Sequence, residues 1–139
     1  MRLFFADSNF WIALLNPRDA LHPKATALSK SLSGDRIVTS EMVLTELLND
    51  YGKRGEALRH AAIRLIERLR RNPNVSIVPQ SSLQFQDALA LYAERGDQTW
   101  GHTDCSSFRI MDRDGITQAL TYDRHFKQAG FQALLRDSI

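Results

Sequence analysis

The sequence has 139 residues and a mass of 15.8 kDa, and at roughly 150 residues per domain it predicts one domain over residues 1–139. Its 43% hydrophobic and 24% charged residues are typical of a globular domain and disfavour disorder or a coiled coil. No apolar stretch approaches the roughly 20 residues of a membrane-spanning helix, and Asp7 comes too early for a signal peptide. We therefore expect a cytoplasmic location and no membrane partner.

The single cysteine, Cys105, excludes an internal disulfide and a paired-cysteine metal site, so any metal must be held by oxygen or histidine. The net charge of +2 is unevenly divided along the chain. Residues 53–71 carry seven basic side chains against two glutamates, a net charge of +5, and the remaining chain is mildly acidic.

Short apolar runs alternate along the chain with longer stretches of helical spacing. The runs predict five strands, at Leu3–Ala6, Ile37–Thr39, Val75–Val78, Ala119–Thr121 and Phe131–Leu134. Between them the spacing predicts helices over Phe10–Leu15, Ala25–Leu32, Met42–Tyr51, Ala57–Leu69, Leu83–Tyr92 and Ser106–Met111. Strands separated by helices require crossover connections, which indicate an α/β fold with a mostly parallel sheet covered by helices on both faces.

Residues with known preferences for helix ends support these boundaries. Gly115 follows a predicted helix in the position of a C-terminal cap. Thr39 or Ser40 is expected to cap the helix that carries Glu46, and Thr103 the helix that carries Asp104.

The basic segment is itself an amphipathic helix, since six apolar residues fall on one arc at about 100° per residue: Leu58, Ala61, Ala62, Leu65, Ile66 and Leu69. Its arginines would lie on the flanks and the opposite face, either contacting a phosphate backbone or simply solvated. Ile63 lies outside the apolar arc and is a weak sign of a protein contact. Phe10, Trp11 and the helix Met42–Tyr51 would suit either a groove for a partner helix or the core.

Acidic residues near the ends of predicted strands are the strongest functional signal, because ligands of an open parallel sheet bind outside the carboxyl ends of its strands. The four acids are Asp7, Glu46, Asp104 and Asp123. Gathered at one edge they would repel one another unless a cation lay between them. Carboxylate oxygens suit Mg²⁺ or Mn²⁺, whereas the four histidines lack the spacing of a zinc site. The alternative for each acid is a local one, with Asp7 and Asp123 as helix caps and Glu46 as a surface residue.

Four segments of the chain resemble the PIN-domain ribonucleases, in particular the toxins of VapBC-type toxin–antitoxin pairs. They are Phe5-Ala6-Asp7-Ser8-Asn9-Phe10-Trp11, residues 39–46 ending in Thr45-Glu46, residues 103–108 beginning Thr103-Asp104-Cys105, and residues 115–126 with Thr121-Tyr122-Asp123-Arg124-His125-Phe126. The resemblance covers nearly the whole chain. One departure precedes Asp104, where Gly101 follows Trp100 in place of the serine that many relatives have.

The resemblance implies a PIN-like fold, a five-stranded parallel sheet flanked by helices, and Mg²⁺- or Mn²⁺-dependent hydrolysis of RNA phosphodiester bonds to 5′-phosphate and 3′-hydroxyl ends. It implies that the same four acids bind the metal. Asp7 and Asp104 would be the main ligands, Asp123 a ligand directly or through water, and Glu46 a ligand or the residue that orients the water.

Five further residues near these acids are candidates for supporting or substrate contacts: Ser8, Asn9, Thr103, Ser106 and Arg124. The resemblance also implies a cognate antitoxin protein that covers the active site, and in many relatives a homodimer. Two other hypotheses stay open. One is a PIN-like scaffold that binds RNA or protein without cutting, and the other is a PIN ribonuclease of RNA processing that has no antitoxin.

Overall fold

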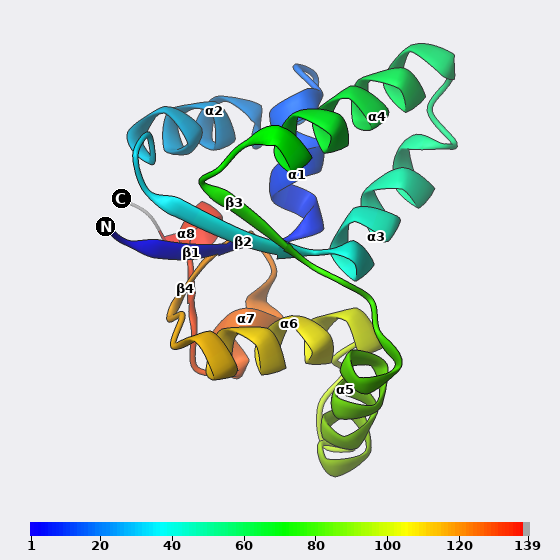
Figure 1. Ribbon diagram of the computed structural model, residues 1–139, viewed down its shortest axis with the longest axis vertical. Coiled ribbons are helices and arrows are strands. Elements are labelled where there is room, and N and C mark those ends of the chain that lie inside the picture. The colour runs from blue at the N-terminus through cyan, green and yellow to red at the C-terminus, as the bar shows by residue number, and fades with distance from the viewer. Residues whose placement is uncertain (138–139) are drawn as a thin grey trace.

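The computed structural model describes residues 1–137, in which the predicted alternation of strands and helices is present (Figure 1). In chain order the elements are β1 (Leu3–Ala6), α1 (Ser8–Leu15), α2 (His22–Ser31), β2 (Arg36–Ser40), α3 (Glu41–Tyr51), α4 (Glu56–Arg71), β3 (Val75–Val78), α5 (Ser82–Glu94), α6 (His102–Asp114), β4 (Gln118–Leu120), α7 (Arg124–Gln128), β5 (Gln132–Ala133) and α8 (Leu134–Asp137). None of these helices is both long and apolar enough to span a bilayer.

The five strands form one parallel sheet in the order β3-β2-β1-β4-β5. Figure 1 shows α1, α2, α3 and α4 on one side of this sheet and α5, α6 and α7 on the other. The predicted fold class is therefore confirmed. β1 is the central strand, and the chain moves outward from it first through β2 and β3 and then through β4 and β5.

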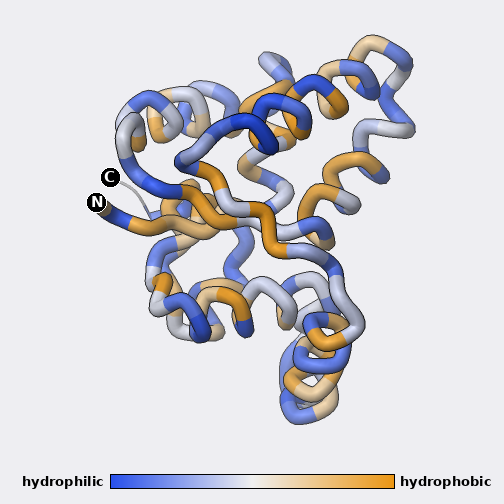
Figure 2. The backbone as a smooth tube through the Cα atoms, in the orientation of Figure 1, coloured by the Kyte–Doolittle hydropathy of each residue, from blue (hydrophilic) through white to orange (hydrophobic). Residues whose placement is uncertain are grey.

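The core lies between the sheet and the two helical layers. In Figure 2 the central strands are largely orange, which marks hydrophobic residues. Phe10 and Trp11 are almost fully buried, so they belong to this core and not to a groove for a partner. The apolar arc of α4 faces inward as predicted, through Ala62, Leu65 and Leu69. The prediction that this segment is an amphipathic helix with a buried apolar face is thus confirmed.

The boundary of the fifth strand differs from the prediction. The fifth strand is shorter than Phe131–Leu134, because the short helix α8 begins at Leu134. The backbone N–H of Leu135 donates to Thr121 O at 3.0 Å, and the Leu135 side chain is fully buried, so this apolar segment packs as a helical turn. Gly115 ends α6 as predicted, with a positive φ of 68° that a residue with a side chain rarely adopts.

Candidate active site

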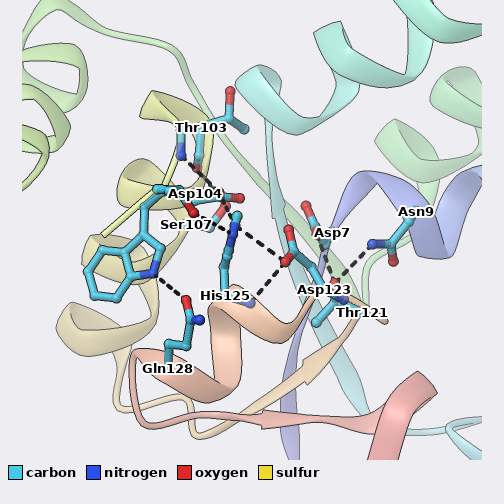
Figure 3. A network of polar contacts seen from close by, with 12 residues as sticks. Asp7, Asn9, Thr103, Asp104, Ser107, Thr121, Asp123, His125 and Gln128 are labelled. Atoms are coloured by element: carbon cyan, nitrogen blue, oxygen red, sulfur yellow. Dashed lines mark hydrogen bonds and ion pairs between the residues drawn. The ribbon is translucent and has the colours of Figure 1, made fainter. Parts of the chain in front are cut away.

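The register of the two central strands brings distant parts of the chain together. Phe5 pairs with Ala119 and Ala6 with Leu120, so β1 and β4 end at the same level. Asp7 and Thr121, the next residues of the two strands, consequently lie side by side, and the Thr121 hydroxyl donates to Asp7 Oδ2 at 2.9 Å (Figure 3).

The Thr121 hydroxyl is the centre of a small hydrogen-bond network. Its oxygen accepts from Asn9 Nδ2 at 3.2 Å and from the backbone N–H of Asp123 at 3.1 Å. Asn9 Oδ1 in turn accepts from the backbone N–H of Tyr122. Asn9 and Thr121 therefore tie the start of α1 to the segment that carries Asp123.

Glu46 approaches the site from α3, which begins directly after β2. Ser40 caps this helix by accepting from the Val43 N–H at 3.1 Å, whereas Thr39 is used elsewhere and donates to Ala6 O. Ser8 at the start of α1 donates to Glu46 Oε1 at 3.0 Å. Glu46 is thus an exposed acid at the rim of the site, held by a residue next to Asp7.

Asp104 lies in the first turn of α6 and closes that turn on itself. Its Oδ2 accepts from the Gly101 N–H at 3.0 Å, and Gly101 is the residue that caps the helix. The prediction that Thr103 caps this helix is wrong, because the helix already begins at His102. An acid at this position is favoured by the exposed N–H groups of the helix start.

The side chain of Asp123 has both a local and a site contact. Its Oδ1 accepts from the His125 backbone N–H at 2.9 Å, which is the capping bond expected at the start of α7. The same oxygen lies 3.4 Å from Nδ1 of the His125 ring. Capping and membership of the acidic cluster are therefore compatible.

The four acids act on one another electrostatically. Burial raises the pKa of Asp7 to about 7, and the charges of Asp104 and Glu46 add to this shift, against the Ser8 N–H and the Thr121 hydroxyl. Loss of water contact and then the charge of Asp123 raise the pKa of Asp104, opposed by the Gly101 N–H and His125. The pKa of Glu46 is raised in the same way, by partial desolvation and by Asp104 and Asp123, against the Ser8 and Thr103 hydroxyls.

This donor set fits a divalent cation. Ligand-type atoms of Asp104, Asp123 and His125 lie within 4.8 Å of one another, so two carboxylates of this cluster can reach one cation. Asp7, only 4% exposed, adds a carboxylate for which the protein supplies no cationic partner among residues 1–137. Several carboxylates that raise one another's pKa values in one place fit a divalent-cation site, because a cation between them would offset their repulsion.

The structure divides the five supporting candidates. Ser8, Asn9 and Thr103 lie beside the acids, as described above. Ser106 does not, because it is fully buried and its hydroxyl accepts from Gln84 Nε2 of α5 at 3.1 Å. Arg124 is exposed at the first position of α7, next to Asp123.

Two residues at the site were not predicted from the sequence, Thr121 and His125. The His125 ring lies between Asp104 and Asp123, and Nδ1 is 3.1 Å from Asp104 Oδ2 (Figure 3). The signal for Thr121 was its spacing, since Thr121 and Asp123 alternate along the extended segment that leaves β4, whereas His125 lies in the first turn of α7, two residues after the cap Asp123. Such alternation places side chains on the same side of the backbone.

Away from the acids, α3 and α4 border a groove of about 520 Å³. It is lined by Leu48, Asn49, Tyr51, Gly52, Arg59, Ala62 and Ile63. Ile63, which the sequence singled out, is 48% exposed and lies in this groove. The arginines of α4 outside the apolar arc are exposed, and their contact with RNA stays a prediction.

Comparisons with known proteins agree with this geometry. Residues 4–132 match the model of the PIN domain family. The chain is 33% identical over 133 residues to the 23S rRNA-specific endonuclease VapC20 of Mycobacterium tuberculosis, covering 93% of this chain and 95% of that protein.

Solved structures share the fold of this chain. The crystal structure of VapC20, described as a sarcin-ricin loop cleaving toxin, superposes with a TM-score of 0.81 at 27% identity, over 92% of this chain and 95% of that one. VapBC2 from Rickettsia felis, bound to a promoter DNA fragment, shares the fold with a TM-score of 0.67 at 15% identity, over 94% of this chain and 96% of that one. The family match and the VapC20 relative confirm the resemblance: this chain belongs to the PIN-domain family and is VapC-like.

Proposed function

We propose that this protein is a metal-dependent endoribonuclease whose active site is the cluster of Asp7, Glu46, Asp104 and Asp123. The observation that carries the proposal is the convergence of these acids from β1, α3, α6 and the end of β4, with a buried Asp7 whose pKa is raised to about 7. Such a cluster is costly to keep ionised without a cation. We also propose that residues 1–139 belong to a single PIN domain.

Each acid has a role that its surroundings support. Asp7 and Asp104, fixed by Thr121 and Gly101, would hold the cation, and Asp123 would do so directly or through water. Glu46, at the exposed rim and held by Ser8, would hold the cation or orient the attacking water. When bound, Mg²⁺ or Mn²⁺ neutralises phosphate charge and activates water, giving 5′-phosphate and 3′-hydroxyl ends.

We further propose ribosomal RNA as the substrate class, since the relative VapC20 is named as a 23S rRNA-specific endonuclease. Such a substrate agrees with the cytoplasmic location expected from the sequence. The exposed basic face of α4 and Arg124 beside Asp123 would add sequence-independent phosphate contacts.

The activity is tested by incubating the purified chain with total RNA in Mg²⁺ or Mn²⁺ and mapping the new ends. We expect discrete 5′-phosphate ends that vanish in EDTA and in Asp7→Asn and Asp104→Asn. Asp97→Asn is the matched control, because Asp97 is an exposed acid paired with Arg95. Cleavage that survives both site variants would contradict the proposed site. A metal-loaded protein that binds RNA without cutting it would favour the scaffold hypothesis, and ends confined to precursor RNAs would favour a processing enzyme.

An antitoxin partner and a homodimer belong to this proposal as well. VapC20 is described as a toxin, and the groove between α3 and α4 offers an antitoxin a partly apolar surface with Arg59 in its lining. A homodimer would be supported by the exposed apolar side chains of α5, namely Leu83, Phe85, Leu89 and Tyr92. Light scattering of the wild type and of Leu89→Glu tests the dimer surface, because the variant should dissociate a dimer only if it forms through α5.

A further inference from the structure

The ring of His125 is fixed by hydrogen bonds on both of its nitrogens. Nδ1 lies 3.1 Å from Asp104 Oδ2 and 3.4 Å from Asp123 Oδ1. Nε2 lies 3.3 Å from the hydroxyl of Thr99, in the segment between α5 and α6. The ring is one-fifth exposed, and Figure 3 shows it between the two acids.

These contacts determine which groups donate. An ionised carboxylate only accepts hydrogen bonds, so the Nδ1 of His125 must carry the proton that faces Asp104. Nε2 lies within hydrogen-bond distance of the Thr99 hydroxyl, which can donate to a ring nitrogen or accept from it. Both ring nitrogens are therefore engaged, Nδ1 as the donor to Asp104 and Nε2 by Thr99.

In the carboxylates of Asp104 and Asp123, these contacts involve one oxygen of each pair. Asp104 Oδ2 accepts from both the Gly101 N–H and the imidazole. Asp123 Oδ1 accepts from the His125 N–H and also faces the ring. Among residues 1–137, no protein donor is hydrogen-bonded to Asp104 Oδ1 or Asp123 Oδ2, so these oxygens are available to an ion.

We propose that His125 is a positioning residue, which orients the Asp104 and Asp123 carboxylates toward the divalent cation without being a ligand itself. Its Nδ1 is protonated toward Asp104, and its Nε2 is occupied by Thr99, so neither nitrogen is free to coordinate. Without the imidazole, two neighbouring carboxylates would turn apart through their mutual repulsion. Hydrogen bonds to metal-ligating carboxylates typically change metal affinity 10–100-fold when they are removed. This inference rests on the metal site of the proposed function.

The test is Mn²⁺ binding to the full-length chain, measured by electron paramagnetic resonance of the free ion. We expect His125→Ala to weaken binding by roughly 10–100-fold. His125→Asn places an amide donor near the position of Nδ1 and should bind within a few-fold of the wild type. His125→Gln places its amide near the position of Nε2 and should behave like the alanine variant. His60→Ala is the matched control, because His60 is exposed on α4.

A second variant keeps the test informative if His125→Ala folds poorly. Thr99→Val removes the hydroxyl that sets the ring but leaves the imidazole, and we expect a loss of a few-fold in the same direction. A spectroscopic reading addresses coordination directly, since a ligating nitrogen would give a ¹⁴N hyperfine coupling in the Mn²⁺-loaded wild type. We expect no such coupling from His125.

Three outcomes would overturn the inference. They are equal Mn²⁺ affinity in the wild type and His125→Ala, an asparagine variant as weak as the alanine variant, and a ¹⁴N coupling that disappears in His125→Ala. A wild type that binds no Mn²⁺ would overturn the proposed metal site and this inference with it. Binding that is lost in Asp104→Asn but unchanged in His125→Ala would overturn the inference alone.

Discussion

The two sides of the acidic cluster differ in how the protein compensates negative charge. Asp7 is 4% exposed, and within residues 1–137 its one side-chain donor is the neutral hydroxyl of Thr121. Asp104 and Asp123 are more exposed, at 18% and 29%, and are held by backbone N–H groups and by the His125 imidazole. The same kind of carboxylate is thus costly at the end of β1 and is partly compensated by hydrogen bonds at the starts of α6 and α7.

This difference predicts where a bound cation would have its largest effect. Hydrogen bonds from backbone N–H groups favour the ionised form of an acid, and burial disfavours it. At Asp7 burial dominates and raises the pKa to about 7, from an ordinary value of 3.8. The effect of Asp7 on stability should therefore depend on pH and on metal. The effects of Asp104 and Asp123 should depend on their local hydrogen bonds.

The largest expected effect is a stabilisation by Asp7→Asn in metal-free protein. Between about pH 4 and pH 7 the folded state keeps a proton on Asp7 that the unfolded state has lost, so wild-type stability falls as pH rises through that range. The amide variant has no charge to bury and should gain about 2–4 kcal/mol in free energy of unfolding at about pH 8. Urea unfolding at about pH 4 and pH 8 measures it, and the gain should vanish at the lower pH. A variant less stable than wild type at the higher pH would mean that the protein itself compensates this carboxylate.

Metal should give the next largest effect. A cation at 100 times its dissociation constant stabilises the folded state by about 2.7 kcal/mol. Because the cation must replace the proton on Asp7, Mg²⁺ should raise the melting temperature more at about pH 8 than at about pH 6. Thermal unfolding with and without Mg²⁺ measures this shift. Equal shifts at both pH values would place the cation away from Asp7.

Thr121→Val should reduce stability by about 1–3 kcal/mol, because it leaves Asp7 and Asn9 without their shared partner in a buried place. Thr117→Val is the control, since Thr117 is exposed just before β4. Chemical denaturation of both variants measures the difference. Equal losses in the two would show that the network contributes nothing specific.

The smallest effect separates the two roles of Asp123. Asp123→Ala removes the cap of α7 and should cost about 1 kcal/mol, whereas Asp123→Asn keeps a capping oxygen and should leave stability nearly unchanged. Both variants should lose RNA cleavage. Unfolding curves and the cleavage assay, run on the same samples, test this, and an active asparagine variant would confine Asp123 to capping.

The sequence predicted the architecture because the signals involved are periodic. Buried parallel strands are short apolar runs, and α4 shows its core-facing arc directly. The strand-end rule also placed Asp7 and Asp123 at the correct edge of the sheet. Boundaries that depend on tertiary packing were harder to predict from the sequence. At Leu134, for example, the apolar residues begin the short helix α8 instead of extending β5.

The supporting residues were predicted less well, for a geometric reason. Ser106 follows Asp104 by two positions, which is about 200° around a helix, so it points to the opposite side and meets Gln84. Thr121 and His125 were missed because their importance comes from partners more than twenty residues away or on another strand. Only the strand register and the start of α6 bring those partners into reach.

The central position of β1 also bears on when the protein can act during its own synthesis. Asp7 is made early, but its partner Thr121 and the acid Asp123 follow more than a hundred residues later in the chain. Pairings between such distant segments form late in folding, because long loops must close first. A partly synthesised chain therefore carries the β1–β2–β3 half of the sheet without a complete set of acids. Translation itself would delay the nuclease until the polypeptide has passed residue 123.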